Sequence, residues 1–317
     1  ITAAPTNNVF EIDNTAPTLT QVTPITTPTN DTTPSYVFTT DEAGTISTNI
    51  TQGFSSPDPA TVSTGSHQTI TFNPLVEGTY SGKTIMVTDA AGNVGTLDIP
   101  TFVIDNTAPT ADITYDSVGP YKNGETVVIT ATFNEDMLET NVPKIAITST
   151  GTSNLTATDM TRSSATVYTY DYDIPTGDST NATITLSVGT DLAGNVITAA
   201  PTNNVFEIDN TAPTADITYN SVGPYKNGET VVITATFNED MLETNVPKIA
   251  ITSTGTSNLT ATDMTRSSAT VYTYDYDIPT GDSTNATITL SVGTDLAGNV
   301  ITAAPTNNVF EIDNTAP

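Results

Sequence analysis

Hydrophobic and polar residues alternate along many short segments of the chain. In residues 125–134, the apolar side chains of Val127, Ile129, Ala131 and Phe133 fall on one side of an extended backbone. Residues 181–189 show the same period of two. Such alternation is typical of antiparallel strands with one buried face and one solvent-exposed face. The pattern therefore predicts half-buried antiparallel strands and no helices.

About seven such strands fit into each stretch of roughly 100 residues, separated by turns rich in Gly, Pro, Asn and Asp. The remaining strands predicted for one stretch are 111–115, 144–148, 154–158, 165–173 and 205–208. Residues 34–40, 68–72 and 83–88 fit the same plan. The predicted fold class is all-β, with tandem immunoglobulin-like β-sandwich domains in an extended array.

Internal repeats divide the chain. Residues 110–213 and 214–317 are one unit written twice, differing only at Asp116 and Asn220. Residues 18–109 form a diverged unit that ends on the same Ile-Asp-Asn-Thr-Ala-Pro signature. We therefore predict a variant immunoglobulin-like domain at 18–109 and two repeat domains at 110–213 and 214–317. Near-identical copies in series indicate a protein that spans a distance or binds through several copies at once, and they argue against a catalytic function.

Residues 1–17 recur as 197–213 and 301–317. We expect them to be the terminal G strand and linker of a preceding, incomplete repeat, with Val9, Phe10 and Ile12 in the strand. A domain of a neighbouring molecule is the alternative partner for this strand. Folding back onto residues 18–109 would contradict both expectations.

The amino-acid composition and net charge limit the classes of molecule that the chain can bind. The chain has 35 acidic and 7 basic residues, for a net charge of −28, which would repel nucleic acid and anionic membrane surfaces. Charged residues are only 13% of the chain and hydrophobic residues 36%, a balance that permits packed cores. Cys is absent, which excludes disulfides and thiolate metal sites. Because Trp is absent too, the disulfide-and-tryptophan core of antibody domains is excluded as well. No apolar run reaches the ~20 residues of a membrane span, so we expect no membrane insertion by this segment.

Carboxylate and amide side chains recur at three places in every unit. The linker supplies Asp13, Asn14, Asp105, Asn106, Asp209 and Asn210. The end of the second strand supplies Asp41, Glu42, Glu135, Asp136, Glu239 and Asp240. An Asp-x-Ala-Gly-Asn segment before the last strand supplies Asp89, Asn93, Asp191, Asn195, Asp295 and Asn299.

These three clusters meet at one end of an immunoglobulin-like sandwich, where the linker from the preceding domain also arrives. Several carboxylates held together would repel one another unless a cation neutralised them. The oxygen ligands on offer suit Ca²⁺, which takes 6–8 of them, better than Mg²⁺, which demands octahedral geometry. Taken singly, the clusters have plainer interpretations: a hairpin turn, an extended linker and a solvated loop. Their joint recurrence favours a Ca²⁺ site at each junction.

Other candidate chemistry is weaker. Tyr168, Tyr170 and Tyr172 share one strand face, which is expected to face the core rather than to stack on a sugar. His67 lies in a polar loop, and we expect no enzyme, because neither a nucleophile with a base nor a pocketed carboxylate pair is recognisable. An isopeptide bond from Lys122 or Lys144 to an Asn is an alternative with little support.

Six asparagines fit the N-glycosylation pattern Asn-x-Ser/Thr, although chance matches are expected in a chain rich in Thr and Asn. These candidate glycosylation sites are Asn30, Asn49, Asn154, Asn181, Asn258 and Asn285.

The motifs also carry a resemblance. Asp-x-Ala-Gly-Asn followed by Asp-Asn-Thr-Ala-Pro-Thr, with Tyr-Lys-Asn-Gly-Glu-Thr-Val and Thr-Phe-Asn-Glu-Asp-Met, resembles the tandem Ig-like (Big-type) repeats of giant bacterial and archaeal cell-surface adhesins, stalks and filaments. Residues 18–109, with Thr-Asn-Asp-Thr-Thr-Pro-Ser-Tyr and Asp-Glu-Ala-Gly-Thr-Ile, resemble a sister type. The linker resembles the Asp-Asn-Ala-Pro linkers of cadherins, where Ca²⁺ stiffens the domain junction. The resemblance covers essentially the whole chain and implies an extended stalk rigidified by interdomain Ca²⁺.

Two functions follow as expectations. The first is a structural stalk or filament segment of an extracellular surface protein, which binds Ca²⁺ and neighbouring Ig-like domains of the same or an adjacent chain. The second is an adhesin whose domains themselves bind a cell-surface glycan or another cell. The similarity of the repeats, and the lack of a Trp or Arg hot spot, favour the first.

Overall fold

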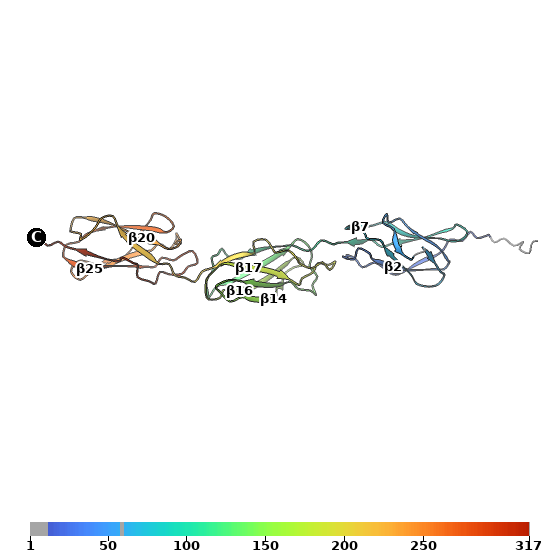
Figure 1. The fold of residues 1–317 in the computed structure, drawn as a ribbon, viewed down its shortest axis with the longest axis horizontal. Helices are drawn as coiled ribbons and strands as arrows, with labels where there is room; N and C mark the ends of the chain where they lie inside the picture. The colour runs from blue at the N-terminus through green and yellow to red at the C-terminus, as the bar shows by residue number, and fades with distance from the viewer. Residues whose placement is uncertain (1–11, 58–59, 317) are drawn as a thin grey trace, which may run out of the picture.

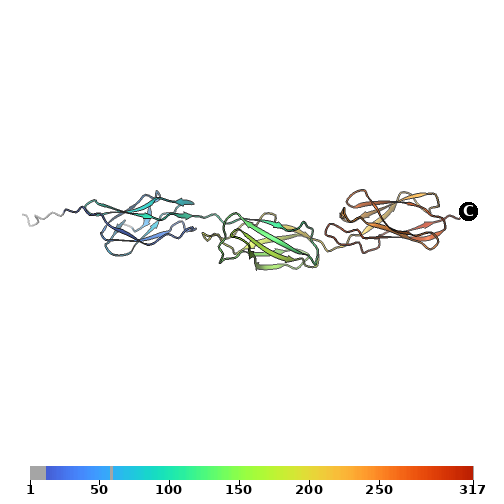
Figure 2. The same ribbon diagram turned by 180° about the vertical axis from the view of Figure 1, so that it is seen from behind.

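Three β-sandwiches follow one another along a single axis. The computed structural model describes residues 12–57 and 60–316, and every regular element in these ranges is a β-strand. The two opposite views show the sandwiches in chain order along the long axis, each joined to the next by one linker (Figures 1 and 2). Each sandwich has its own buried core, and the three cores are separate clusters. The fold is therefore a tandem all-β array, as the alternation predicted.

Ten strands form the first sandwich in its described residues, 18–57 and 60–109. Their order in the sheets is β1-β2-β6-β4, β5-β3-β8-β9 and a two-stranded β10-β7. Their bounds are β1 (Leu19–Thr23), β2 (Ser35–Thr40), β3 (Gly44–Thr48), β4 (Phe54–Ser56), β5 (Thr61–Val62), β6 (Gln68–Phe72), β7 (Gly78–Tyr80), β8 (Lys83–Thr88), β9 (Val94–Ile99) and β10 (Phe102–Ile104).

The second sandwich packs a sheet of order β11-β12-β16-β15 against one of order β14-β13-β17-β18. Labelled A to G along the chain, with C′ after C, these are sheets ABED and C′CFG of an immunoglobulin-like fold. The bounds are β11 (Ala111–Tyr115), β12 (Thr126–Phe133), β13 (Lys144–Thr148), β14 (Leu155–Asp159), β15 (Thr161–Arg162), β16 (Val167–Asp173), β17 (Ser179–Ser187) and β18 (Val205–Ile208).

The third sandwich repeats this plan, as its sequence requires. Its sheets are β19-β20-β24-β23 and β22-β21-β25-β26. The bounds are β19 (Ala215–Tyr219), β20 (Thr230–Phe237), β21 (Lys248–Thr252), β22 (Leu259–Asp263), β23 (Thr265–Arg266), β24 (Val271–Asp277), β25 (Ser283–Ser291) and β26 (Val309–Ile312).

The strand register decides which side chains enter the core. In the second sandwich, Ile129 of β12 lies opposite Tyr170 of β16, and Ala131 lies opposite Tyr168. Tyr168 and Tyr172 are buried, and Tyr170 packs against the same core from its edge. The expectation that the tyrosine face looks inward is thus confirmed. In a domain without Trp, these rings supply the bulk that fills the space between the sheets.

The N-terminal strand prediction can be followed only at its end. Val9 and Phe10 lie outside the described residues. Ile12 is 73% exposed and belongs to no strand. From Asp13 onward, the linker leads directly into the first sandwich, where β1 pairs with β2.

Candidate metal centres

Three carboxylates converge at the entrance of each sandwich. The groups are Asp13, Glu42 and Asp89; Asp105, Glu135 and Asp191; and Asp209, Glu239 and Asp295. In each group, one carboxylate oxygen per residue lies within 4.8 Å of the others. The linker, the end of strand B and the loop after strand F each contribute one residue, which is the convergence that the sequence predicted. A group of this kind could hold a metal ion.

Local turn geometry fixes the Asp of the loop after strand F. In the second sandwich, Asp191 follows β17, and its Oδ1 accepts hydrogen bonds from the backbone N–H groups of Gly194 and Asn195 at 2.7 and 2.8 Å. Gly194 has a φ of +98°, a left-handed conformation that favours glycine. Asp191 is only 1% exposed. The Ala-Gly-Asn turn therefore holds a buried carboxylate in one orientation.

The Asn of the same turn joins the loop to the linker. Asn195 Nδ2 donates to Asp191 Oδ2 at 2.8 Å and to the Asp105 carbonyl at 2.9 Å. Asn299 makes the same two bonds, to Asp295 and to the Asp209 carbonyl. In the first sandwich, Asn93 bonds Asp89 and the Asp13 carbonyl. Each predicted Asn thus lies beside its triad and fastens the preceding unit's linker to the next unit.

The linker Asp is oriented by its own turn. Asp105 Oδ1 accepts the backbone N–H of Thr107 at 3.0 Å, and Asp209 Oδ1 accepts that of Thr211 at 2.9 Å. This bond restrains the side chain in the orientation that brings it into the triad.

The Glu of each triad is the electrostatically strained member. Burial, and then the neighbouring carboxylates of Asp209 and Asp295, together raise the pKa of Glu239 to about 7. The pKa of Glu135 is raised by burial and then by Asp191 and Asp105. In both residues Oε1 is buried without a hydrogen-bond partner. A buried, unpartnered carboxylate oxygen facing two other carboxylates needs either a proton or a cation.

Asp41 belongs to a different contact from the one expected. Its Oδ1 accepts the backbone N–H of Thr18 at 2.6 Å, and that hydrogen bond lowers its pKa. Asn134 and Asn238 make the equivalent bonds to Thr110 and Thr214 at 2.7 Å. Asp41 therefore aligns with these asparagines, and its side chain fastens the start of strand A. The two asparagines belong to the predicted cluster at the end of strand B, but they were not among its predicted ligands.

The linker and the end of strand B were each predicted to supply two ligands, and one residue of each two lies outside the triad. Asp136 and Asp240 are exposed and belong to no triad. Asn14 and Asn106 are exposed as well. Asn210 faces the preceding sandwich, where its Oδ1 accepts the Asn123 N–H at 2.6 Å and its Nδ2 donates to the Gly177 carbonyl at 2.6 Å. Its role there is to close the end of the second sandwich.

The candidate glycosylation sites differ in how their amides are held. Asn49 is fixed between neighbouring segments, with Nδ2 donating to the Gly82 carbonyl at 3.0 Å and Oδ1 accepting the Thr84 N–H at 2.9 Å. Asn154 and Asn258 accept a backbone N–H within a tight turn. Asn181 and Asn285 bond only to the adjacent Thr hydroxyl, and Asn30 is exposed.

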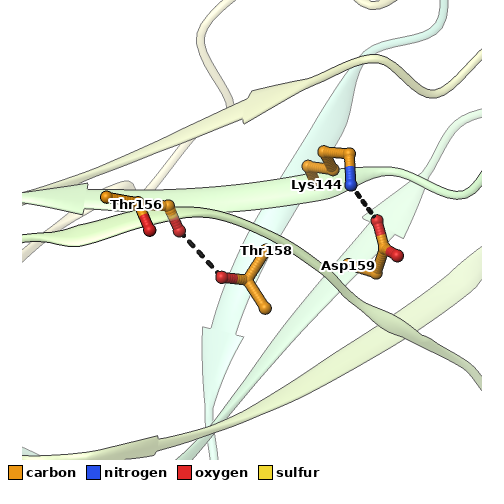
Figure 3. A network of polar contacts seen from close by, with 4 residues as sticks. All are labelled: Lys144, Thr156, Thr158 and Asp159. Carbon is orange, nitrogen blue, oxygen red and sulfur yellow. Dashed lines mark hydrogen bonds and ion pairs between the residues drawn. The ribbon is translucent and has the colours of Figure 1, made fainter.

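The two lysines considered for an isopeptide bond make hydrogen bonds to groups other than an Asn side chain. Lys144 of β13 reaches across to Asp159 of β14, and the pair is partly exposed, with side-chain exposures of 34% and 67% (Figure 3). An exposed ion pair of this kind contributes roughly 0–1 kcal/mol. Lys122 donates to a carbonyl of the third sandwich. His67 is exposed in the turn before β6, as expected.

No family model and no curated protein matches the chain. Among solved structures, it is similar to one described as a membrane-anchored protein from Corynebacterium diphtheriae, with 13% sequence identity and a TM-score of 0.28. That alignment covers 94% of this chain and 91% of the other. A likeness this distant identifies neither a family nor a function. In the part of the chain that the structure describes, no helix has the length and hydropathy needed to cross a membrane.

Proposed function

We propose that the chain is a structural segment of an extracellular stalk or filament whose junctions are bound and stiffened by Ca²⁺. One observation carries this proposal. Each triad takes one carboxylate from the linker that ends one unit and two from the unit that follows. An ion held by such a set bridges two bodies, so its binding energy opposes bending at the linker.

The chemistry of the donors favours Ca²⁺. The candidate ligands are carboxylate oxygens, the linker carbonyls of Asp105 and Asp209 lie on the same contact, and no His or Cys takes part in the triads. Hard oxygen donors suit Ca²⁺ and Mg²⁺, and soft metals prefer sulfur or imidazole. A site assembled from three separate segments adapts more readily to the flexible coordination of Ca²⁺ than to a strict octahedron.

The remaining features fit a surface stalk. A net charge of −28 suits a solvated chain in a medium that contains divalent cations. The sequence likeness to the Ig-like repeats of bacterial and archaeal surface proteins points to the same role. The partners in this proposal are neighbouring units of the same or an adjacent chain, and it involves no catalytic step.

Calorimetric titration of the whole chain with Ca²⁺ tests the proposal. Glu239→Gln should remove one binding equivalent, because it neutralises the central carboxylate of a single triad. Asp240→Asn is the matched control, because this adjacent residue carries the same charge but lies outside the triad. Equal binding by both variants, or no heat at millimolar Ca²⁺, would refute the metal assignment.

The adhesin alternative has one observation in its favour. Each repeat has a groove of about 600 Å³, with mixed apolar and polar lining, between its first and last strands. Tyr115, Tyr121 and Phe206 line it in the second sandwich. Aromatic rings beside polar backbone edges suit a sugar or an extended peptide. A glycan array probed with the whole chain separates the two functions, since only the adhesin predicts saturable binding that substitution of the half-buried groove tyrosines, Tyr115→Ala and Tyr219→Ala, reduces.

A further inference from the structure

The loops after strand F of the second and third sandwiches have identical sequences but different surroundings. Ala297 of the third sandwich is 6% exposed, and Gly298 is half-buried. The corresponding Ala193 is half-buried and Gly194 is exposed. Since the loops themselves are identical, the difference must come from the unit that precedes each of them.

The end of the second sandwich supplies the covering surface. A hollow of about 340 Å³ at this junction is lined by Leu296 and Ala297 from one side. The other side consists of residues of the second sandwich, including Val118, Tyr121 and Glu125. The loop that holds Asp295 therefore rests with its tip against the preceding repeat.

Lys122 makes the polar contact at this surface. Its Nζ donates to the Gly298 carbonyl at 2.5 Å, a partly buried hydrogen bond between residues 176 positions apart. A Cβ at Gly298 would lie 3.0 Å from this Nζ, so the absence of a side chain lets the lysine approach. A hydrogen bond from an ammonium group is stronger than one between neutral groups.

The first junction lacks this lysine. Thr29 and Tyr121 occupy the same place in their sandwiches, because each bridges in parallel to the strand that leads into the linker. The residue after Thr29 is Asn30, which contacts the next loop through its backbone N–H to the Ala193 carbonyl at 3.1 Å. The two junctions therefore share the acidic triad and differ in the second contact.

We infer that Lys122 is a metal-independent clamp between units, which makes the repeat–repeat junction more tightly docked than the variant–repeat junction. The triad and the clamp hold the loop at different points, with Asp295 and Asn299 facing the linker and Gly298 facing Lys122. The clamp needs no ion, so it goes beyond the function proposed above and acts even when Ca²⁺ is removed.

Distance measurements between spin labels can test this clamp, because the chain has no native cysteine. Labels at Ser163→Cys and Ser267→Cys, both exposed positions, report the second junction, and labels at Thr96→Cys and Ser163→Cys report the first. In chelator, Lys122→Met should raise the undocked-to-docked ratio at the second junction roughly tenfold, the effect of losing one such hydrogen bond. The distance distribution of the 163/267 pair should broaden, and that of the 96/163 pair should not.

Lys226→Met is the matched control, because Lys226 is the same position of the third sandwich and lies at the end that contacts no other described unit. Lys122→Arg should restore the narrow distribution, since a guanidinium can donate to the same carbonyl. If Lys122→Met and Lys226→Met give the same widths as the parent, or if Lys122→Met broadens both label pairs equally, the clamp is refuted. Because these measurements are made without Ca²⁺, they stand or fall separately from the metal titration.

Discussion

Replacing Asp209 by Asn should change the stability of the third sandwich in opposite directions with and without Ca²⁺. In the ion-free chain, Asp209 stands in a triad whose carboxylate oxygens lie within 4.8 Å of one another. At that separation and an effective dielectric constant of about 20, each pair of charges repels by about 3.5 kcal/mol once Glu239 is ionised, above its raised pKa of about 7. Partial exposure and salt reduce the net effect to the order of 1 kcal/mol. Removing Asp209 eliminates two of the three repulsions, so the ion-free variant should be more stable than the parent.

With Ca²⁺ present, the sign reverses. An ion bound only by the folded chain stabilises it by about 2.7 kcal/mol at a hundredfold excess over the dissociation constant. Losing a charged ligand removes most of that gain. For a unit of this size, each kcal/mol corresponds to roughly 4–8 °C. Asp209→Asn should therefore lower the calorimetric transition of the third sandwich by about 10 °C in Ca²⁺ and raise it by a few degrees in chelator.

Asp313→Asn is the control for this crossover. Asp313 occupies the same linker position after the third sandwich, and its Oδ1 accepts the Thr315 N–H as Asp209 accepts that of Thr211. It belongs to no triad among the described residues. If Asp209→Asn destabilises the chain equally in Ca²⁺ and in chelator, the carboxylate is only a turn residue and the electrostatic argument is wrong.

Three further outcomes are expected. Because the pKa of Glu239 is raised to about 7, the folded ion-free chain holds a proton that the unfolded chain releases, so the stability of the ion-free chain should fall as pH rises from about 4.5 to 7. For the same reason, Ca²⁺ titrations should show an affinity that falls from pH 8 to pH 6. Small-angle scattering in Ca²⁺ should report a rod on the order of 100–120 Å for the three sandwiches, and a compact particle would contradict the stalk. Asn238→Ala should cost about 1 kcal/mol in denaturant unfolding in chelator and Ca²⁺ alike, because it removes the bond to Thr214 and no candidate ligand; a Ca²⁺-dependent loss would place Asn238 in the metal site.

The sheets were predictable from the sequence where burial alternates strictly. Val127, Ile129, Ala131 and Phe133 all enter the core, and the predicted segment 125–134 is β12 (Thr126–Phe133) with its ends trimmed. The two-residue strand β15 (Thr161–Arg162) was missed, because both residues are exposed and so short a strand shows no period. Strand β14 starts and ends one residue later than expected, since its half-buried face gives a weak signal.

The sites were predictable to the loop but not to the side chain. The sequence brings three acidic clusters to one end, and the structure places one carboxylate from each of them together. Which carboxylate depends on backbone direction: Glu135 points inward and its neighbour Asp136 outward, and Asp209 and Asn210 likewise part in opposite directions. In the first sandwich, Asp41 was predicted as a ligand beside Glu42, but its side chain makes the contact with strand A that Asn134 makes in the second sandwich. The residue type alone cannot reveal this role, because Asp and Asn side chains accept the same hydrogen bond.

The way the candidate site is divided explains how a repeated unit can extend this array. Each unit carries two carboxylates at its entrance and a third on the linker that leaves its far end. A unit by itself therefore holds two separated fragments of a site, and the triad closes only where one unit follows another. Inserting another copy of the unit at a junction adds both fragments, so every new junction receives a complete triad without any further change of sequence. The clamp is likewise divided between two repeats, because Lys122 lies at the exit of one repeat and Gly298 at the entrance of the next. It fails at the variant–repeat junction because Asn30 replaces the lysine, so an array that contains both unit types combines tighter repeat–repeat joints with looser variant–repeat joints.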